Sequence, residues 1–174
     1  MLAAPPVTTV AVLAVALGAC VYDLVSRRVP NALTFGAAAV AVAMHGILSG
    51  WGGVGFTAAG WATGLALFIP LYALGGMGGG DVKLLGAIGA WLGPMGAVWT
   101  GLYGAIAGGV FALAIALWKG YTKTAFQNLG AMLRMWSLTG VQPIQRLTLA
   151  DKRAVRLPYA LPLAAGTLAT LCMH

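Results

Sequence analysis

Acidic side chains are scarce in this chain, and one of them follows a run of glycines. The 174 residues contain three acidic residues, Asp23, Asp81 and Asp151, and no Glu. Asp81 comes directly after the segment 75–80, in which five of the six residues are glycine, and an apolar run over 84–91 follows. Glycine lets backbones approach closely, and a helix N-terminus favours negative charge. The stretch predicts either a turn whose aspartate only caps a helix or a site where an extended peptide lies beside a carboxylate.

Asp23 and Asp81 could act together as a pair of acids. Neither a Glu, a paired His nor a serine motif accompanies them. Two neighbouring carboxylates cannot both ionise easily, so one keeps a proton near neutral pH. The ionised acid can take a proton from water while the protonated acid polarises a carbonyl group. The titration belongs to the pair, so neither acid has a fixed role. The predicted chemistry is that of an aspartic protease.

The elements that carry these acids belong to a membrane protein. Hydrophobic residues make up 60% of the chain and charged residues 7%, whereas about 25% charged is typical of soluble domains. The net charge of +7 is not spread over a polar surface of the kind that binds nucleic acid. Anionic lipid headgroups are the predicted partners of these cations. The length fits one domain, a single membrane-embedded unit over residues 1–174.

The positions of the basic residues set the predicted number of crossings. The ten Lys and Arg residues fall in three places: Arg27 and Arg28, Lys83, and the segment 119–156. A span needs roughly 20 apolar residues. The chain therefore has room for one crossing before Arg27, two between Arg28 and Lys83, two between Lys83 and the segment 119–156, and one after that segment. The sequence predicts an all-α polytopic protein with six transmembrane helices, its cations in the cytoplasm and both termini outside. The predicted spans cover about 7–22, 32–48, 54–74, two halves of 84–118, and 157–173, with turns at 49–53 and 93–94.

On this topology both acids lie at the cytoplasmic boundary. Asp23 closes the first span and Asp81 opens the fourth. Pro30 is expected to end the first helix, and Asn31 to cap the second. An ionisable residue at membrane depth is costly and is a functional candidate by default.

The segment 119–156 is the sizeable polar connection of the chain. Within it Phe126, Leu129, Met132, Leu133 and Trp136 recur at helical spacing. The pattern predicts an amphipathic helix on the inner leaflet, or else a soluble helix packed on the bundle.

In its motifs the chain resembles a type IV prepilin peptidase, a member of the GxGD group of membrane aspartic proteases. The resemblance runs from about Asp23 to Ala165 and is weakest over 119–151. The residues that carry it are Asp23 with Pro30-Asn31, then Gly78-Gly79-Gly80-Asp81-Val82-Lys83-Leu84-Leu85, Gly89-Ala90-Trp91-Leu92-Gly93, and Arg156-Leu157-Pro158-Tyr159 before the last span.

The resemblance implies an endopeptidase that removes the short basic leader of prepilins and pseudopilins, usually just after a glycine, at the cytoplasmic face of the bacterial inner membrane. It implies that Asp23 and Asp81 are the catalytic pair. It also implies substrate-binding or loop roles for residues around them, namely Gly78, Gly79, Gly80, Lys83, Pro30 and Asn31. Because a chain of charge +7 should repel a basic leader, recognition is expected to rest on the apolar helix of the substrate.

The resemblance also bears on methylation. Longer members of the family carry a cytoplasmic insert with a cysteine tetrad and a methyltransferase activity. This chain has neither, and it is similar in size to the short peptidases of tight-adherence (Flp-type) pilus systems. We therefore expect cleavage without N-methylation.

Several other residues have modest predicted roles. His45 stands alone in the second span and is expected to pack or to form a hydrogen bond. Asp151 lies among basic residues and is expected to be a local charge partner or cap. Lys83 either biases the ionisation of the acids or reaches the headgroups. Eight glycines are expected at close helix contacts: Gly60, Gly64, Gly86, Gly89, Gly101, Gly104, Gly108 and Gly109.

The cysteines predict no metal site or disulfide. Cys20 and Cys172 are expected near opposite faces of the membrane, too far apart for a bridge. Neither belongs to a CxxC pair, so no zinc site is indicated, and no cofactor is predicted.

Three other functions stay open for the same residues. Intramembrane acids also mark proton channels and transporters, although no inverted repeat is visible. A metal-dependent transferase would use the acids to hold a divalent ion, for which two carboxylates are few ligands. An inactive assembly scaffold would not need both acids.

Overall fold

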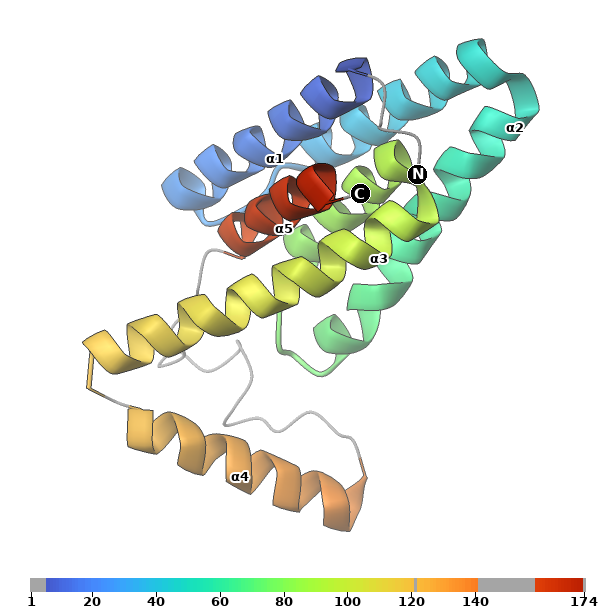
Figure 1. Cartoon of the computed structure of the whole chain (residues 1–174). Helices are drawn as coiled ribbons and strands as arrows, with labels where there is room; N and C mark the ends of the chain where they lie inside the picture. Colours follow the sequence, from blue (N-terminus) through green and yellow to red (C-terminus); the bar gives the residue numbers. More distant parts are fainter. Residues whose placement is uncertain (1–5, 121, 141–158, 174) are drawn as a thin grey trace.

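The computed structural model describes residues 6–120, 122–140 and 159–173, and the regular structure of these residues is entirely helical. Three helices are long and apolar enough to cross a membrane, and a fourth is shorter and apolar. The predicted all-α class and membrane character are confirmed. The helices are α1 (Pro6–Ser26), α2 (Asn31–Ala73), α3 (Gly79–Trp118), α4 (Thr122–Thr139) and α5 (Ala160–Met173) (Figure 1).

Helix α2 folds back on itself at Gly50. This residue has φ 60° and ψ −143°, which is not helical. A straight helix would separate His45 and Thr57 by about 18 Å, yet His45 Nδ1 and Thr57 Oγ1 share a hydrogen bond of 2.8 Å. Figure 1 shows the two halves of α2 running in opposite directions. The turn predicted at 49–53 is confirmed.

Helix α3 reverses in the same way at Gly93, where φ is 74° and ψ is −176°. A straight helix would place Gly89 and Ala97 about 12 Å apart. Instead, a Cβ built on Gly89 would lie 2.9 Å from the Cβ of Ala97. Pro94 follows the reversal and cannot donate a backbone hydrogen bond. The break predicted at 93–94 is confirmed.

Small residues bring the helices into backbone contact. A side chain on Gly60 would overlap the carbonyl group of Gly89, and one on Gly166 would meet the backbone of α3 at Thr100 and Gly104. Such contacts let helices pack closely in lipid. The prediction is wrong for Gly109, which has open space where a side chain would stand. Gly108, the preceding residue, lies against Tyr159, whereas Gly109 faces away from the bundle.

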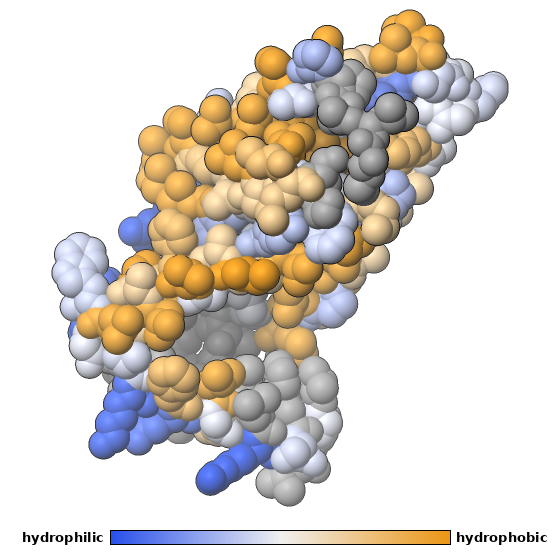
Figure 2. Space-filling model, in the orientation of Figure 1, coloured by the Kyte–Doolittle hydropathy of each residue, from blue (hydrophilic) through white to orange (hydrophobic). Residues whose placement is uncertain are grey.

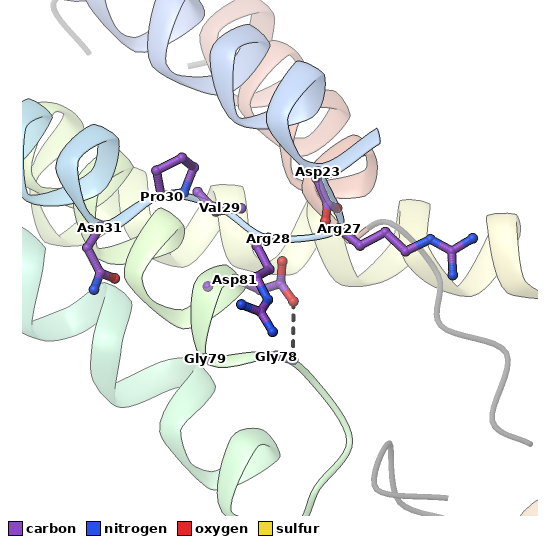
Figure 3. Close-up of a pocket in the computed structure, with 10 residues that line it drawn as sticks. Asp23, Arg27, Arg28, Val29, Pro30, Asn31, Gly78, Gly79 and Asp81 are labelled. Atoms are coloured by element: carbon purple, nitrogen blue, oxygen red, sulfur yellow. Dashed lines mark hydrogen bonds between the residues drawn. The ribbon is translucent and has the colours of Figure 1, made fainter. Parts of the chain in front are cut away.

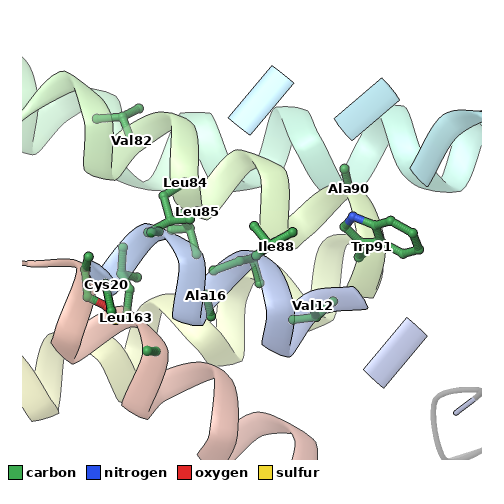
Figure 4. Close-up of a cluster of buried hydrophobic side chains, with 14 of the residues drawn as sticks. Val12, Ala16, Cys20, Val82, Leu84, Leu85, Ile88, Ala90, Trp91 and Leu163 are labelled. Carbon is green, nitrogen blue, oxygen red and sulfur yellow. The ribbon is translucent and has the colours of Figure 1, made fainter. Parts of the chain in front are cut away.

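The first half of α3 lies at the centre of the bundle. Leu84, Leu85 and Ile88 are fully buried, and Val12 of α1 and Leu163 of α5 are fully buried with them. Figure 4 shows these side chains gathered between the three helices. Because Asp81 begins this central half-helix, the packing of the core fixes the position of its backbone.

Large apolar side chains cover the outside of the bundle. Trp51 is 90% exposed at the reversal of α2, and Ile47 is 85% exposed. Figure 2 shows hydrophobic surface along the bundle and hydrophilic surface around α4, the lower helix. This distribution suits a bundle surrounded by lipid.

Helix α4 confirms the predicted helix in the polar connection. It follows α3 after a turn at Gly120, whose φ is 72°. Phe126 and Leu129 are exposed, and the side chains of Met132, Leu133 and Trp136 lie outside the described ones. Asp151 and residues 156–158, for which roles were predicted, lie outside the described residues.

Candidate active site

Both predicted acids line one pocket. Its volume is about 440 Å³, and it opens where α1 ends and α3 begins (Figure 3). One wall is the connection between α1 and α2, and the other is the glycine segment before α3. The lining residues are Asp23, Arg27, Arg28, Val29, Pro30, Asn31, Gly78, Gly79, Gly80 and Asp81.

Asp23 stands in the last turn of α1 and is 9% exposed. Its Oδ2 accepts a hydrogen bond of 3.3 Å from the backbone N–H of Ala160. Ala160 is the first residue of α5, and a helix N-terminus stabilises a negative charge. Asp23 is therefore both a lining residue of the pocket and a contact to α5.

Asp81 stands in the first turn of α3. Its Oδ2 accepts a hydrogen bond of 3.2 Å from the backbone N–H of Gly78, so it caps its own helix. The capping interpretation is thus confirmed, and Asp81 lines the pocket as well. Asp23 and Asp81 are close enough for their charges to interact.

The connection between the helices differs from the prediction in two details. Helix α1 ends at Ser26 and not at Pro30, because Arg27 turns into the left-handed region at φ 53° while its N–H still bonds the Asp23 carbonyl at 2.9 Å. Pro30, with φ −63° and ψ 138°, holds the N-cap position of α2 without a side-chain hydrogen bond. Asn31 is the first residue of the helix and does not cap it, because its side chain bonds Lys83 instead.

The three glycines before Asp81 each lie against a different group. A Cβ on Gly78 would stand 3.1 Å from Asp81 Oδ2, one on Gly79 3.4 Å from the Tyr72 ring, and one on Gly80 3.3 Å from Val29 Cβ. A side chain at any of these positions would crowd the acid, the helix before it or the opposite wall. The glycines therefore keep the two walls close together.

Lys83 is the predicted site residue that the pocket does not include. Its Nζ donates a hydrogen bond of 2.9 Å to Asn31 Oδ1 and lies 5.6 Å from the centre of the Phe35 ring. Neither predicted role for Lys83 describes this contact, since the ammonium group reaches across to α2.

His45 lies away from the pocket, in the first half of α2. It bonds Thr57, and its ring packs edge-on against Phe56 and Trp91. The predicted packing or hydrogen-bonding role is confirmed.

Sequence reasoning missed the contribution of α5 to the site. Cys20 Sγ donates to the Ala160 carbonyl at 3.3 Å, and the Tyr159 ring packs edge-on against Phe68 at 6.0 Å. Tyr159 is close enough to Asp81 for an electrostatic interaction between the two side chains. The basic-proline-aromatic signal before the last span pointed to Tyr159, but nothing in the sequence pointed to Cys20.

Within the described residues, no three metal-ligating side chains come together. Cys20 is buried and Cys172 is exposed, and both are free thiols. The pocket offers two carboxylates, backbone amides and two arginines, and a carboxylate can act as a general base toward a water molecule.

A model of the type IV leader peptidase family matches residues 10–113 of the chain. The matched region contains both acids, both walls of the pocket and both helix reversals. No curated protein and no solved structure gives a match.

Proposed function

Because the chain belongs to the type IV leader peptidase family, we propose that it removes the leaders of prepilins and pseudopilins with Asp23 and Asp81 as its catalytic pair. The observation that carries this proposal is that both carboxylates line one pocket although they come from different helices. Membership in the family makes the chain a protease, and the shared pocket supports the aspartic type.

The proposed reaction is hydrolysis by a water molecule held between the acids. The ionised carboxylate takes a proton from the water, and the water oxygen bonds to the scissile carbonyl carbon. The protonated carboxyl group donates its proton to the carbonyl oxygen. Collapse of the tetrahedral intermediate breaks the C–N bond: the leaving amine takes a proton from the carboxyl group of the pair, and a hydroxyl group of the intermediate gives its proton to the other carboxylate as the new carboxylic acid forms. The pair returns to its starting state with one proton.

We propose six crossings, with both termini outside and the pocket at the cytoplasmic face of the bacterial inner membrane. The reversals at Gly50 and Gly93 support this count, since they divide α2 and α3 into two segments each. Arg27, Arg28 and Lys83 would then face the anionic inner leaflet. The topology can be tested by fusing to the C-terminus a reporter that works only in the cytoplasm. Activity of this fusion would contradict the topology.

We further propose cleavage without N-methylation, as in the short peptidases of tight-adherence pilus systems. Only residues 27–30 separate α1 from α2, so the connection has no room for an inserted domain. The chain also holds just two cysteines, too few for a tetrad. Both observations support an enzyme that only cleaves.

The test is a reconstituted reaction. The full chain is purified and reconstituted into vesicles that contain anionic lipid. A candidate prepilin is added, and the masses of the products are measured by mass spectrometry. We expect a product that has lost its leader and carries no methyl group. A matched prepilin whose glycine before the cleavage point is replaced by a bulky residue should stay intact. Uncleaved prepilin, together with a proton flux into the vesicles that requires Asp23 and Asp81, would instead favour a transporter.

A further inference from the structure

Lys83 bonds Asn31, a lining residue of the pocket, and is not itself a lining residue. We propose that Lys83 and Asn31 form a positioning pair that fixes the distance between the two walls and thereby the distance between Asp23 and Asp81. This inference rests on the proposed peptidase function, since it assigns roles within the same site. It gives both residues a task other than contacting the leader peptide.

The two walls come from distant parts of the chain. The connection 27–30 begins four residues after Asp23, whereas the segment 78–80 directly precedes Asp81. The whole of α2 lies between them along the chain, and its two halves run away from the pocket and back to it. The covalent structure therefore does not set the separation of the walls, and direct contacts must do so.

Two such contacts are present. At one point Val29 packs on Gly80, where a Cβ would meet Val29 Cβ at 3.3 Å and Val29 N at 3.5 Å. At the other, Lys83 Nζ bonds Asn31 Oδ1 at 2.9 Å. The first contact is apolar and limits how close the walls come, and the second is directional and stops them from moving apart.

The ammonium group has a second contact on α2. It lies 5.6 Å from the centre of the Phe35 ring, one turn further along α2, where a cation is attracted to the ring face. A hydrogen bond with an ionised donor is stronger than one between neutral groups. Asn31 lines the pocket and Lys83 does not, so Lys83 acts on the site through Asn31.

Small displacements of the walls should lower the rate. Reacting groups must be held in a narrow range of geometry, and a misplacement of about 1 Å can cost roughly 100-fold in rate. Partial loosening of one wall should therefore lower kcat without much change in KM, since substrate contacts persist.

A double-mutant cycle tests the inference. Lys83→Met keeps the apolar stem and removes the donor, and Asn31→Ala removes the acceptor. We expect each change to lower kcat for prepilin cleavage about tenfold with KM within about twofold, and the double variant to lose about tenfold and not about 100-fold. Lys123→Met on α4, exposed and away from the pocket, is the matched control and should cleave at the wild-type rate.

A conservative variant separates positioning from general damage. Asn31→Asp still offers an oxygen to Lys83 and should keep most of the activity. The double variant Asn31→Asp/Lys83→Met has no donor for that oxygen and should lose most of the activity. Membrane insertion and Tm in detergent are compared for every variant, so that a folding defect is recognised. If Asn31→Ala does not fold, the Asn31→Asp pair of variants carries the test.

Multiplying losses in the double variant would overturn the inference, because they would show that the two residues act separately. A rise in KM with unchanged kcat would also overturn it, by indicating direct contact with the substrate. If the wild-type chain does not cleave prepilin at all, the proposed function fails first, and that result is distinct from either of these.

Discussion

The carboxylate of Asp23 accepts a hydrogen bond of 3.3 Å from the backbone N–H of Ala160, 137 residues further along the chain. Cys20, one turn before Asp23, donates to the carbonyl group of the same residue at 3.3 Å. The end of α1 thus holds the first residue of α5 by both of its backbone groups. Because Ala160 is fully buried, the position of this acid depends on α5 as well as on its own helix.

The Cys20 contact gives a first prediction. Cys20→Ala removes the S–H donor and should lower the cleavage rate by about two- to fivefold, since a thiol is a weak donor and a single bond contributes modestly. Cys20→Ser keeps a donor and should lose less. The exposed Cys172 supplies the control, and Cys172→Ala should cleave normally. Equal rates for the wild type and Cys20→Ala would show that the bond from Cys20 to α5 does not help to position the acid.

The contact between α2 and α3 gives a second prediction. Gly60→Ala would force a methyl group into the carbonyl of Gly89 and should cost about 1–3 kcal/mol, as overpacked sites do. Gly55→Ala, in the same half of α2, has open space and should change stability by less than about 0.5 kcal/mol. The measurement is thermal unfolding in detergent, read as Tm. Similar Tm values for the two variants would contradict the close contact.

The two reversal glycines give a third prediction. Gly50 and Gly93 have positive φ, and other residues in such conformations cost about 1–3 kcal/mol. Gly93→Ala should destabilise more than Gly50→Ala, because its side chain would also overlap the Phe56 ring, whereas nothing surrounds Gly50. The free energies of unfolding of the two variants are compared with the wild type. The opposite order would contradict the described turn at Gly93.

Much of the helical arrangement could be predicted from the sequence, because lipid imposes simple rules. Apolar length sets the spans, and glycine with proline marks the reversal at Gly93. The same rules placed Asp23 and Asp81 at one end of the bundle. They could not say that the acids share a pocket, since that depends on how the helices pack against one another.

The details of the site depend on contacts between distant residues, and these were not predictable. Asn31 has the right type and place for a helix cap, but Lys83 competes for its side-chain oxygen. Pro30 has the right type for a helix end, but Arg27 turns the chain three residues earlier. In both cases a tertiary contact or a backbone turn overrides a local preference.

The arginines of the pocket wall give a fourth prediction. Arg27 and Arg28 line the pocket, and like charges repel, so they oppose the binding of a basic leader. The double variant Arg27→Gln/Arg28→Gln should insert normally and cleave with an unchanged or up to about threefold lower KM. Binding is measured at low and high salt, because screening should reduce the difference. Loss of leader binding in the inserted variant would show instead that the arginines recognise the substrate.

The fifth prediction concerns the acids themselves. Asp23→Asn and Asp81→Asn keep the shape of the side chain and remove its charge and acid–base function, a function worth about 10²- to 10⁴-fold in rate. Each change alone should therefore abolish detectable processing. Both variants should still reach the membrane, because the amide oxygen can accept the bonds from Ala160 and Gly78 that the carboxylates accept now.

The most direct measurement is the mass of a candidate prepilin after incubation with the wild type, Asp23→Asn and Asp81→Asn, at equal amounts of membrane-inserted protein. A pair of acids that work together predicts loss of the leader with the wild type and intact prepilin with either variant. Cleavage by either inserted variant at a rate near that of the wild type would contradict the two-aspartate mechanism.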